Sequence, residues 1–178
     1  MDLEIKSWID KIDQLKLPRW DDLPNIGLYF EQVLYYVNEH LSSIFLDSKE
    51  PEDFFVTASM INNYVKHKIM VPPVKKKYYQ AHIAFIFTIT ILKQVGNLKD
   101  VHGGITHLRT VLGKEQAFDT FIDFLETSLH SVKNELLEKP DGTFYEKAVS
   151  IDLLPLKTAT IAFASSMLSR YLFSKIKK

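Results

Sequence analysis

Apolar residues recur at intervals of three and four positions through most of this 178-residue chain, and that spacing is typical of one face of an α-helix. The clearest stripe lies between Glu115 and Lys139, at Phe118, Phe121, Ile122, Leu125, Leu129, Val132 and Leu136. Comparable stripes predict helices over residues 3–15, 28–45, 59–70, 98–112 and 155–175. The pattern therefore predicts an all-α fold of about six to seven helices.

Two segments of the chain have patterns that fit more than one local structure. The β-branched residues between Gln80 and Val95 favour a strand, but the segment is long for one, and we expect a buried helix. The adjacent glycines Gly103 and Gly104 interrupt the stripe of residues 98–112, and each costs about 1 kcal/mol relative to alanine in a helix. We expect a break or a kink there.

Prolines predict the connections between helices. Pro18 and Pro24 bracket a short non-helical link, Pro51 lies in an acidic connection over residues 47–53, and residues 140–142 form a turn. Pro72 and Pro73 are expected to end the helix of residues 59–70, because proline cannot donate a backbone hydrogen bond and disfavours helix in the residue before it. The VKKKYY sequence that follows suits a hairpin arm, which would be a small β-wing.

Composition excludes several classes of protein. The hydrophobic content of 46% and a formal net charge of zero are those of a folded domain rather than a disordered chain. Cysteine is absent, which excludes disulfides, thiolate metal sites and a cysteine nucleophile. The longest apolar run, Ile83 to Leu92, is far shorter than the roughly twenty residues of a membrane span. With no apolar signal core at the N-terminus, we expect a cytoplasmic protein without membrane contact.

The charges are unevenly distributed along the chain. The 22 basic and 22 acidic residues balance, yet Phe54 to Lys99 contains no Asp or Glu. That segment holds Lys66, Lys68, Lys75, Lys76, Lys77, Lys93 and Lys99. A segregated basic segment polarises the surface and attracts a polyanion, of which nucleic acid is the usual example.

One helix in this segment has the polar groups to contact a DNA groove. In the helix of residues 59–70, Ser59, Asn62, Asn63 and Lys66 share the outward face. Asparagine pairs bidentately with adenine, and serine and lysine reach phosphates or base acceptors. The alternative is an ordinary solvated surface, and on this helix alone that interpretation is the stronger.

The arm that follows adds weight to the interpretation as a DNA-binding surface. Two prolines hold VPPVKKKYY extended, so Lys75, Lys76, Lys77 and Tyr78 are predicted to hold the DNA backbone beside the groove. The sequence FVTASMINNYVKHKIMVPPVKKKYYQAHIAFIFTITILKQV resembles the winged helix-turn-helix head of MerR-type regulators. That resemblance implies a recognition helix, a basic wing and an apolar helix.

A closer resemblance runs from LPRWDDLPNIGLYFEQV through KKKYY, over roughly residues 18–112. The chain is similar there to a bacterial family described only as a domain of unknown function, number 1836, on the string MINNY…PP…KKKY. The family resemblance implies a fold and DNA binding but no known activity. MerR-type heads carry a short helix before the recognition helix, whereas this chain has the long helix of residues 28–45.

These observations predict a DNA-binding transcriptional regulator whose partner is double-stranded DNA. Residues 1–112 would form the N-terminal helices and the winged helix-turn-helix, and residues 113–178 a C-terminal helical extension for homodimerisation or effector sensing. The alternative is a helical module for protein interaction or small-molecule binding that does not bind DNA. An effector pocket built on Phe118, Phe121, Tyr145, Phe163 and Tyr171 is conceivable.

We expect neither catalysis nor a cofactor. No nucleophile, base and orienting group are spaced to act together. His102 and His107 are five residues apart, which does not place them on one helical face, and no third ligand is spaced to join them in a metal site.

Overall fold

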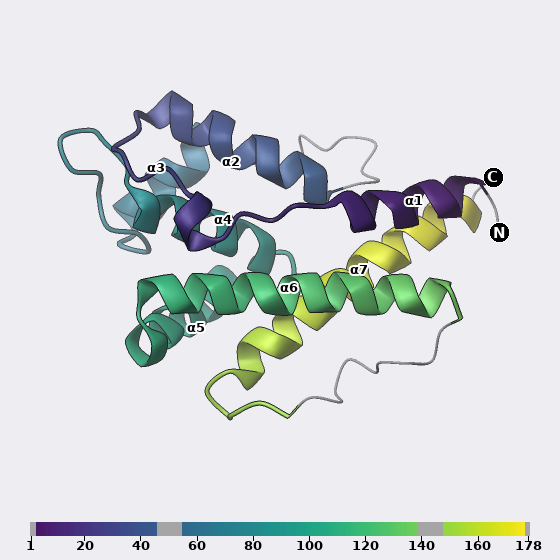
Figure 1. The fold of residues 1–178 in the computed structure, drawn as a ribbon. Coiled ribbons are helices and arrows are strands. Elements are labelled where there is room, and N and C mark those ends of the chain that lie inside the picture. The colour runs from purple at the N-terminus through teal and green to yellow at the C-terminus, as the bar shows by residue number, and fades with distance from the viewer. Residues whose placement is uncertain (1–2, 46–54, 139–147, 177–178) are drawn as a thin grey trace.

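The computed structural model describes residues 3–45, 55–138 and 148–176, and within them the chain is all-α (Figure 1). Its helices are α1 (Leu3–Gln14), α2 (Phe30–Ile44), α3 (Ala58–Lys66), α4 (Gln80–Leu92), α5 (Leu98–Leu112), α6 (Lys114–Leu136) and α7 (Leu154–Ile176), with a 3₁₀ turn η1 (Trp20–Asp22). The all-α part of the predicted fold class is confirmed. The acidic connection over 47–53 and the turn at 140–142 lie outside the described residues.

Helix α4 lies at the centre of the molecule and contacts α2, α5, α6 and α7. Nearly every residue from His82 to Leu92 is buried, including Ile83, Ile86 and Ile89, which have no exposed surface. A helix that is apolar on all sides is stable only inside a core. The Thr90 hydroxyl avoids an unpaired buried polar group by donating to the Ile86 carbonyl at 2.7 Å. The choice of helix over strand for this segment is confirmed.

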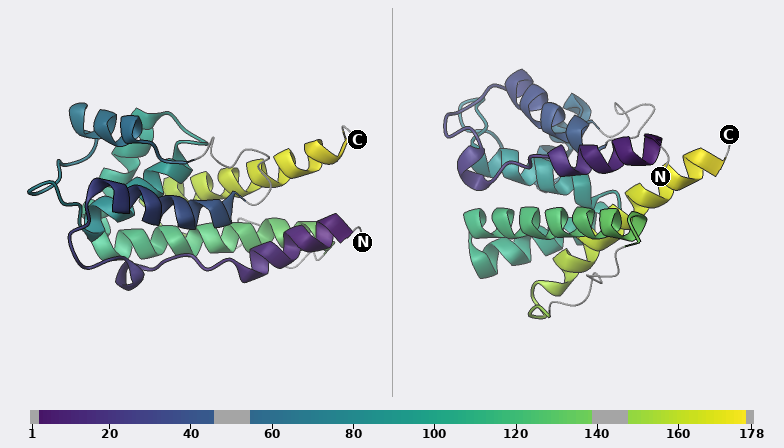
Figure 2. Two further views of the ribbon diagram at one scale, coloured as in Figure 1. Left: turned by 90° about the horizontal axis from the view of Figure 1, so that it is seen from above. Right: turned by 45° about the vertical axis from the view of Figure 1, so that its right-hand side comes forward.

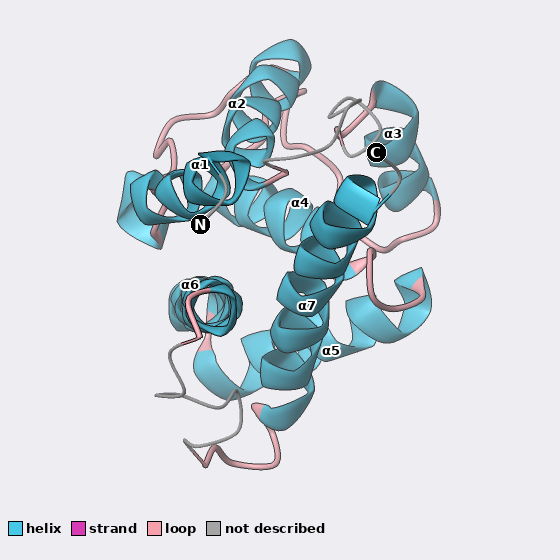
Figure 3. Ribbon diagram, turned by 90° about the vertical axis from the view of Figure 1, so that its right-hand side faces the viewer, coloured by secondary structure: helices cyan, strands magenta, loops and turns pink. Residues whose placement is uncertain are grey.

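Helices α6 and α7 pack against each other, and α1 lies along α6 (Figure 3). The indole of Trp8 on α1 stacks on the ring of Tyr171 on α7, with centroids 5.3 Å apart. Lys133 of α6 pairs with Asp13 of α1 at 2.5 Å. One continuous cluster of buried side chains includes residues from both 1–112 and 113–178, so the two regions share a core.

The link between Pro18 and Pro24 is fastened to α6 by polar contacts. The Arg19 guanidinium donates to Asp123 and Glu126, each at 2.6 Å, and to the Asp119 carbonyl at 3.2 Å. The Trp20 backbone N–H donates to the Asp119 carboxylate at 2.8 Å. These contacts hold η1, and with it Trp20, against α6 although the link has no regular secondary structure of its own beyond one turn.

The predicted β-wing is not formed by strands. Across the described ranges there is no β-strand, only two isolated antiparallel bridges, Leu28 with Tyr78 and Val74 with Lys77. The reason is that Pro72 and Pro73 have no N–H to donate before the turn, so the ladder cannot extend on that side. What remains is a short hairpin tip over residues 74–77.

The predicted break at the paired glycines is also absent. Helix α5 runs without interruption from Leu98 to Leu112, and the Asn97 side chain caps its start by accepting from the Asp100 N–H at 2.9 Å. A side chain at Gly103 or Gly104 would meet no atom within 4 Å. Neither glycine is therefore required by a close contact. The helix stays continuous although both glycines have a lower helix propensity than alanine.

Replacing Gly103 with alanine should stabilise the protein by about 0.5–1 kcal/mol, because alanine loses less backbone entropy in a helix and finds open space here. Chemical denaturation followed by circular dichroism measures the change. The matched control is Gly113→Ala. Gly113 has a φ of 80°, in the left-handed region, so that substitution should destabilise the protein. Equal effects of the two substitutions on the free energy of unfolding would contradict the view that Gly103 is an ordinary helical position and Gly113 a left-handed one.

Candidate nucleic-acid interface

Helix α3 presents the predicted polar face to solvent. The Thr57 hydroxyl caps its start by accepting from the Met60 N–H at 3.3 Å. Ile61 and Tyr64 point into the core and are 0% and 4% exposed. Because those two residues fix the rotation of the helix, the opposite face is exposed, with Ser59, Asn62, Asn63 and Lys66 on it. No helix among the described residues covers these four side chains, all of which are exposed.

The end of α3 differs from the prediction. The helix stops at Lys66, well before Pro72 and Pro73. Lys68 takes a left-handed conformation with a φ of 58°. The N–H groups of Ile69 and Met70 then both donate to the Tyr64 carbonyl, at 2.8 and 3.1 Å. The backbone closes this helix end through its own hydrogen bonds, and the prolines follow in an already extended segment.

The connection from α2 to α3 is unlike a standard helix-turn-helix. Two helices of that motif are joined by about three to four residues. Here α2 ends at Ile44 and α3 begins at Ala58. The Asn38 side chain on α2 fixes the end of the connection, donating to the Val56 carbonyl at 3.0 Å and accepting from the Val56 N–H at 2.8 Å. Helix α2 is therefore tied to the start of α3 by an amide pair rather than by a tight turn.

The hairpin tip places two lysines at the outermost point of a tight turn. Val74 and Lys77 exchange both backbone hydrogen bonds, at 3.0 and 2.9 Å. Lys75 and Lys76 between them have φ values of 48° and 63° and are exposed. Positive φ at both central residues is the pattern of a type I′ turn, which favours Asn-Gly. Lysine in such a position costs on the order of 1–2 kcal/mol.

Lys77 and Tyr78 lie closer to the body of the protein than the tip. The Lys77 ammonium is 5.3 Å from the centroid of the Tyr29 ring, and the residue is half-buried. Tyr78 is only 5% exposed, and burial raises the pKa of its phenol. Its backbone exchanges two 2.8 Å hydrogen bonds with Leu28, and its ring packs against Phe30. Tyr78 anchors the hairpin, and because its side chain is buried we do not propose it as a DNA contact.

His82 joins the hairpin to α4. Its Nδ1 accepts from the Tyr79 N–H at 3.0 Å, and its Nε2 lies 3.3 Å from the Pro72 carbonyl, to which it donates. This pattern requires the neutral ring with the proton on Nε2. Burial lowers the pKa of His82, and the positive charges of Lys114 and Arg109 lower it further. No motif in the sequence singles out His82 for this role.

Helix α3 and the segment of residues 67–79 lie at the same end of the molecule, away from the two termini (Figure 2). The exposed side chains around the tip include the apolar residues Val71 and Val74, which are 63% and 56% exposed. No acidic residue belongs to the chain from Phe55 to Lys99, so all the charged side chains that this segment contributes are positive. This segment therefore contributes a basic surface with apolar residues interspersed to this end of the protein.

The aromatic residues proposed for an effector pocket are divided between two places. Phe118 and Phe121 line a small hollow between η1, α4, α5 and α6. Phe163 packs on Phe45, and Tyr171 on Trp8, so neither of these belongs to that hollow. Tyr145 lies outside the described residues.

The described part of the chain contains neither a cluster of metal ligands nor a membrane-spanning helix. No three side chains of the histidine, aspartate and glutamate types gather there as metal ligands. Among the same residues, no helix combines the length and the apolar character needed to cross a membrane.

The fold and the basic end together define an all-helical protein with an exposed polar helix beside a lysine-tipped hairpin. The chain belongs to the family described as "Domain of unknown function (DUF1836)", whose model matches residues 18–124 and so includes α2, α3, the hairpin, α4 and α5. The predicted family is confirmed. Neither a curated protein nor a solved structure matches the chain.

We expect the protein to lose stability in acid through His82. Its pKa is lowered in the folded state, so its contribution is present in full above the unfolded value of about 6.5 and is lost as the pH falls through the lowered pKa. Protonation also removes the acceptor for the Tyr79 N–H. The free energy of unfolding, measured between pH 5 and 7, should rise with pH more steeply than in a His82→Gln variant. Identical slopes would contradict this role.

Proposed function

We propose that this protein is a DNA-binding transcriptional regulator of MerR-like type, with α3 in the major groove and the hairpin tip on the adjacent backbone. The observation that carries the proposal is the turn at Lys75 and Lys76. Both residues hold left-handed conformations that lysine disfavours, at a point where a charge is fully accessible. Unfavourable backbone conformations concentrate at functional sites. Two positive charges projecting from a rigid tip suit contact with phosphates.

The polar face of α3 supports the sequence-reading part of the proposal. Asn62 and Asn63 are exposed, and an asparagine amide can both donate to and accept from the edge of adenine in the major groove. Ser59 and Lys66, on the same face, supply hydroxyl and ammonium donors for phosphates or base acceptors. Lys77, held near Tyr29, would add a charge at the base of the hairpin.

The MerR-like character rests on the order of elements: an exposed helix, a basic hairpin and then the apolar helix α4. Proteins that bind palindromic operators are commonly two-fold symmetric dimers. We therefore propose a homodimer, in which two copies of α3 would reach successive major grooves. We also propose that the regulator responds to a small-molecule effector whose identity the sequence does not indicate.

Selection from a random duplex pool tests the proposal directly. The purified protein is mixed with the pool at low and moderate salt, and bound DNA is recovered by gel shift and sequenced. A recovered motif, especially a palindromic one, would support a regulator. Binding without a motif would support a non-specific role instead, and no binding at low salt would contradict DNA binding altogether.

The Asn62→Ala variant should bind DNA with reduced sequence preference. Losing one bidentate contact to a base costs about 1–3 kcal/mol at the base pair concerned and leaves the phosphate contacts intact. Competition between the selected site and single-base variants of it measures the change. The matched control is Asn97→Ala, an exposed asparagine that caps α5 rather than lying on α3. An unchanged preference in Asn62→Ala would exclude this residue from base contact.

The double variant Lys75→Asn/Lys76→Gly separates the charge of the tip from its shape. Asn-Gly is favoured in a type I′ turn, so the variant should be at least as stable as the parent protein. It should nevertheless bind all DNA sequences more weakly, and the slope of log affinity against log salt should fall by about 2, since two phosphate contacts are lost. Thermal denaturation and salt titrations measure the two effects. Unchanged affinity would contradict the backbone contact.

A further inference from the structure

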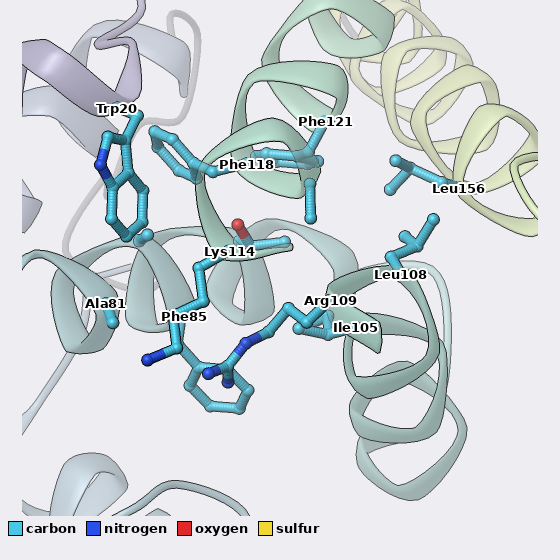
Figure 4. Close-up of a pocket in the computed structure, with 13 residues that line it drawn as sticks. Trp20, Ala81, Phe85, Ile105, Leu108, Arg109, Lys114, Phe118, Phe121 and Leu156 are labelled. Atoms are coloured by element: carbon cyan, nitrogen blue, oxygen red, sulfur yellow. The ribbon is translucent and has the colours of Figure 1, made fainter. Parts of the chain in front are cut away.

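A small hollow opens among η1, α4, α5, α6 and α7, and its walls are almost entirely apolar (Figure 4). Trp20 closes one side, Phe85 and Ala81 of α4 form another, and Phe118 and Phe121 of α6 form a third. Its volume is about 30 Å³. The hollow is therefore larger than a site for a single water molecule and has room for a small group of atoms.

Two positively charged side chains stand at this hollow. Arg109 near the end of α5 and Lys114 at the start of α6 both line it, and their side chains extend toward the same edge, beside Phe85 (Figure 4). The positive charges of both also lower the pKa of His82 at the start of α4. No carboxylate belongs to the described residues that line the hollow.

The two cations have no partner within the described chain. The carboxylates of Asp123 and Glu126 are paired with Arg19, and Asp152 is paired with His107. Neither the Arg109 guanidinium nor the Lys114 ammonium makes a hydrogen bond or ion pair with any described residue. Arg109 is partly buried, and Lys114 is exposed. Two convergent cations without a counter-charge favour an anionic group between them.

The start of α6 adds to this positive potential. Gly113, its N-cap residue, has no side chain to accept from the free N–H groups of the first turn. Helix starts carry a partial positive charge, and this one begins at Lys114 itself. An anion beside Arg109 and Lys114 would therefore lie near a third positive element.

We propose that this hollow binds a small organic carboxylate, with its short apolar tail among the aromatic side chains and its carboxylate between Arg109 and Lys114. The small volume of the hollow limits the tail to a few carbon atoms. Apolar walls with a few convergent polar groups are the usual composition of small-molecule sites. The site stands independently of DNA binding, since every residue in it lies apart from the exposed face of α3.

The two tryptophans provide an internal readout. Trp20 lines the hollow, whereas Trp8 is 1% exposed and stacked on Tyr171. Sodium butyrate, titrated into the ¹⁵N-labelled full chain without DNA, should shift the Trp20 indole N–H saturably and leave that of Trp8 in place. A Trp20→Phe variant assigns the two resonances. Sodium chloride at equal ionic strength corrects for salt, and 1-butanol presents the same tail without the charge.

Substitutions then test the two parts of the site separately. Arg109→Gln/Lys114→Gln should weaken butyrate binding by about tenfold or more, because charge-assisted hydrogen bonds are lost from a partly buried site. Lys99→Gln, which removes an exposed charge elsewhere on α5, should leave it unchanged. Ala81→Leu adds bulk to the wall without changing charge and should also weaken binding.

Three results would overturn the proposal. The first is the absence of a saturable shift at Trp20. The second is binding of 1-butanol as tight as that of butyrate, which would remove any role for the cations. The third is unchanged butyrate affinity in Arg109→Gln/Lys114→Gln. Because none of these measurements contains DNA, the carboxylate site and the regulator proposal can fail separately.

Discussion

The burial of α4 on all sides is the constraint on which the rest of the structure depends. A helix with isoleucine and phenylalanine around its whole circumference has to be covered by neighbours, and α2, α5, α6 and α7 cover it. The start of such a helix must then satisfy polar groups in a crowded place. Gln80 does so by donating to the carbonyls of Trp20 and Leu23, each at 3.3 Å, and His82 does so at Tyr79 and Pro72.

The first turns of α4 therefore lie between the hairpin and the hollow. Tyr79 and His82 hold the base of the hairpin, while Ala81 and Phe85, on the same stretch of α4, form a wall of the hollow. Trp20 belongs to both environments, since it lines the hollow and its carbonyl accepts from Gln80. The residues that line the hollow and the residues that support the hairpin therefore share the first turns of α4.

Sequence periodicity predicted the helices well because apolar residues spaced three and four apart lie on one side of a helix, and that side is the one that packs into the core. The failures have local causes. The early end of α3 depends on Lys68 adopting a left-handed conformation and on the Tyr64 carbonyl accepting twice, neither of which has a sequence signal. The glycines of α5 remain helical because the helix is supported by its neighbours. A pattern of alternation could not say which residue of the Tyr78–Tyr79 pair faces inward.

The residues of the candidate sites were predicted unevenly for the same reason. The exposed face of α3 follows from helix geometry once Ile61 and Tyr64 are assigned to the core, so its four polar residues could be named in advance. Arg109 and Lys114 could not, because they lie on different helices and meet only through the tight turn at Gly113. Proximity of this kind depends on tertiary packing, which no local pattern encodes.

Lys75 and Lys76 depart from what their local structure favours, and this departure is the reason for proposing a functional surface there rather than a merely solvated one. A type I′ turn gains stability from asparagine and glycine, and neither lysine at the tip has a side-chain hydrogen bond or ion pair with a described residue that would offset its conformational cost. Solubility alone needs no such placement, since lysines on a helix surface serve it without strain. Where a sequence breaks a local rule without a structural gain, the compensation is expected in function. For two cations at the outermost point of a hairpin, beside an exposed polar helix, contact with a polyanion is the function that we propose.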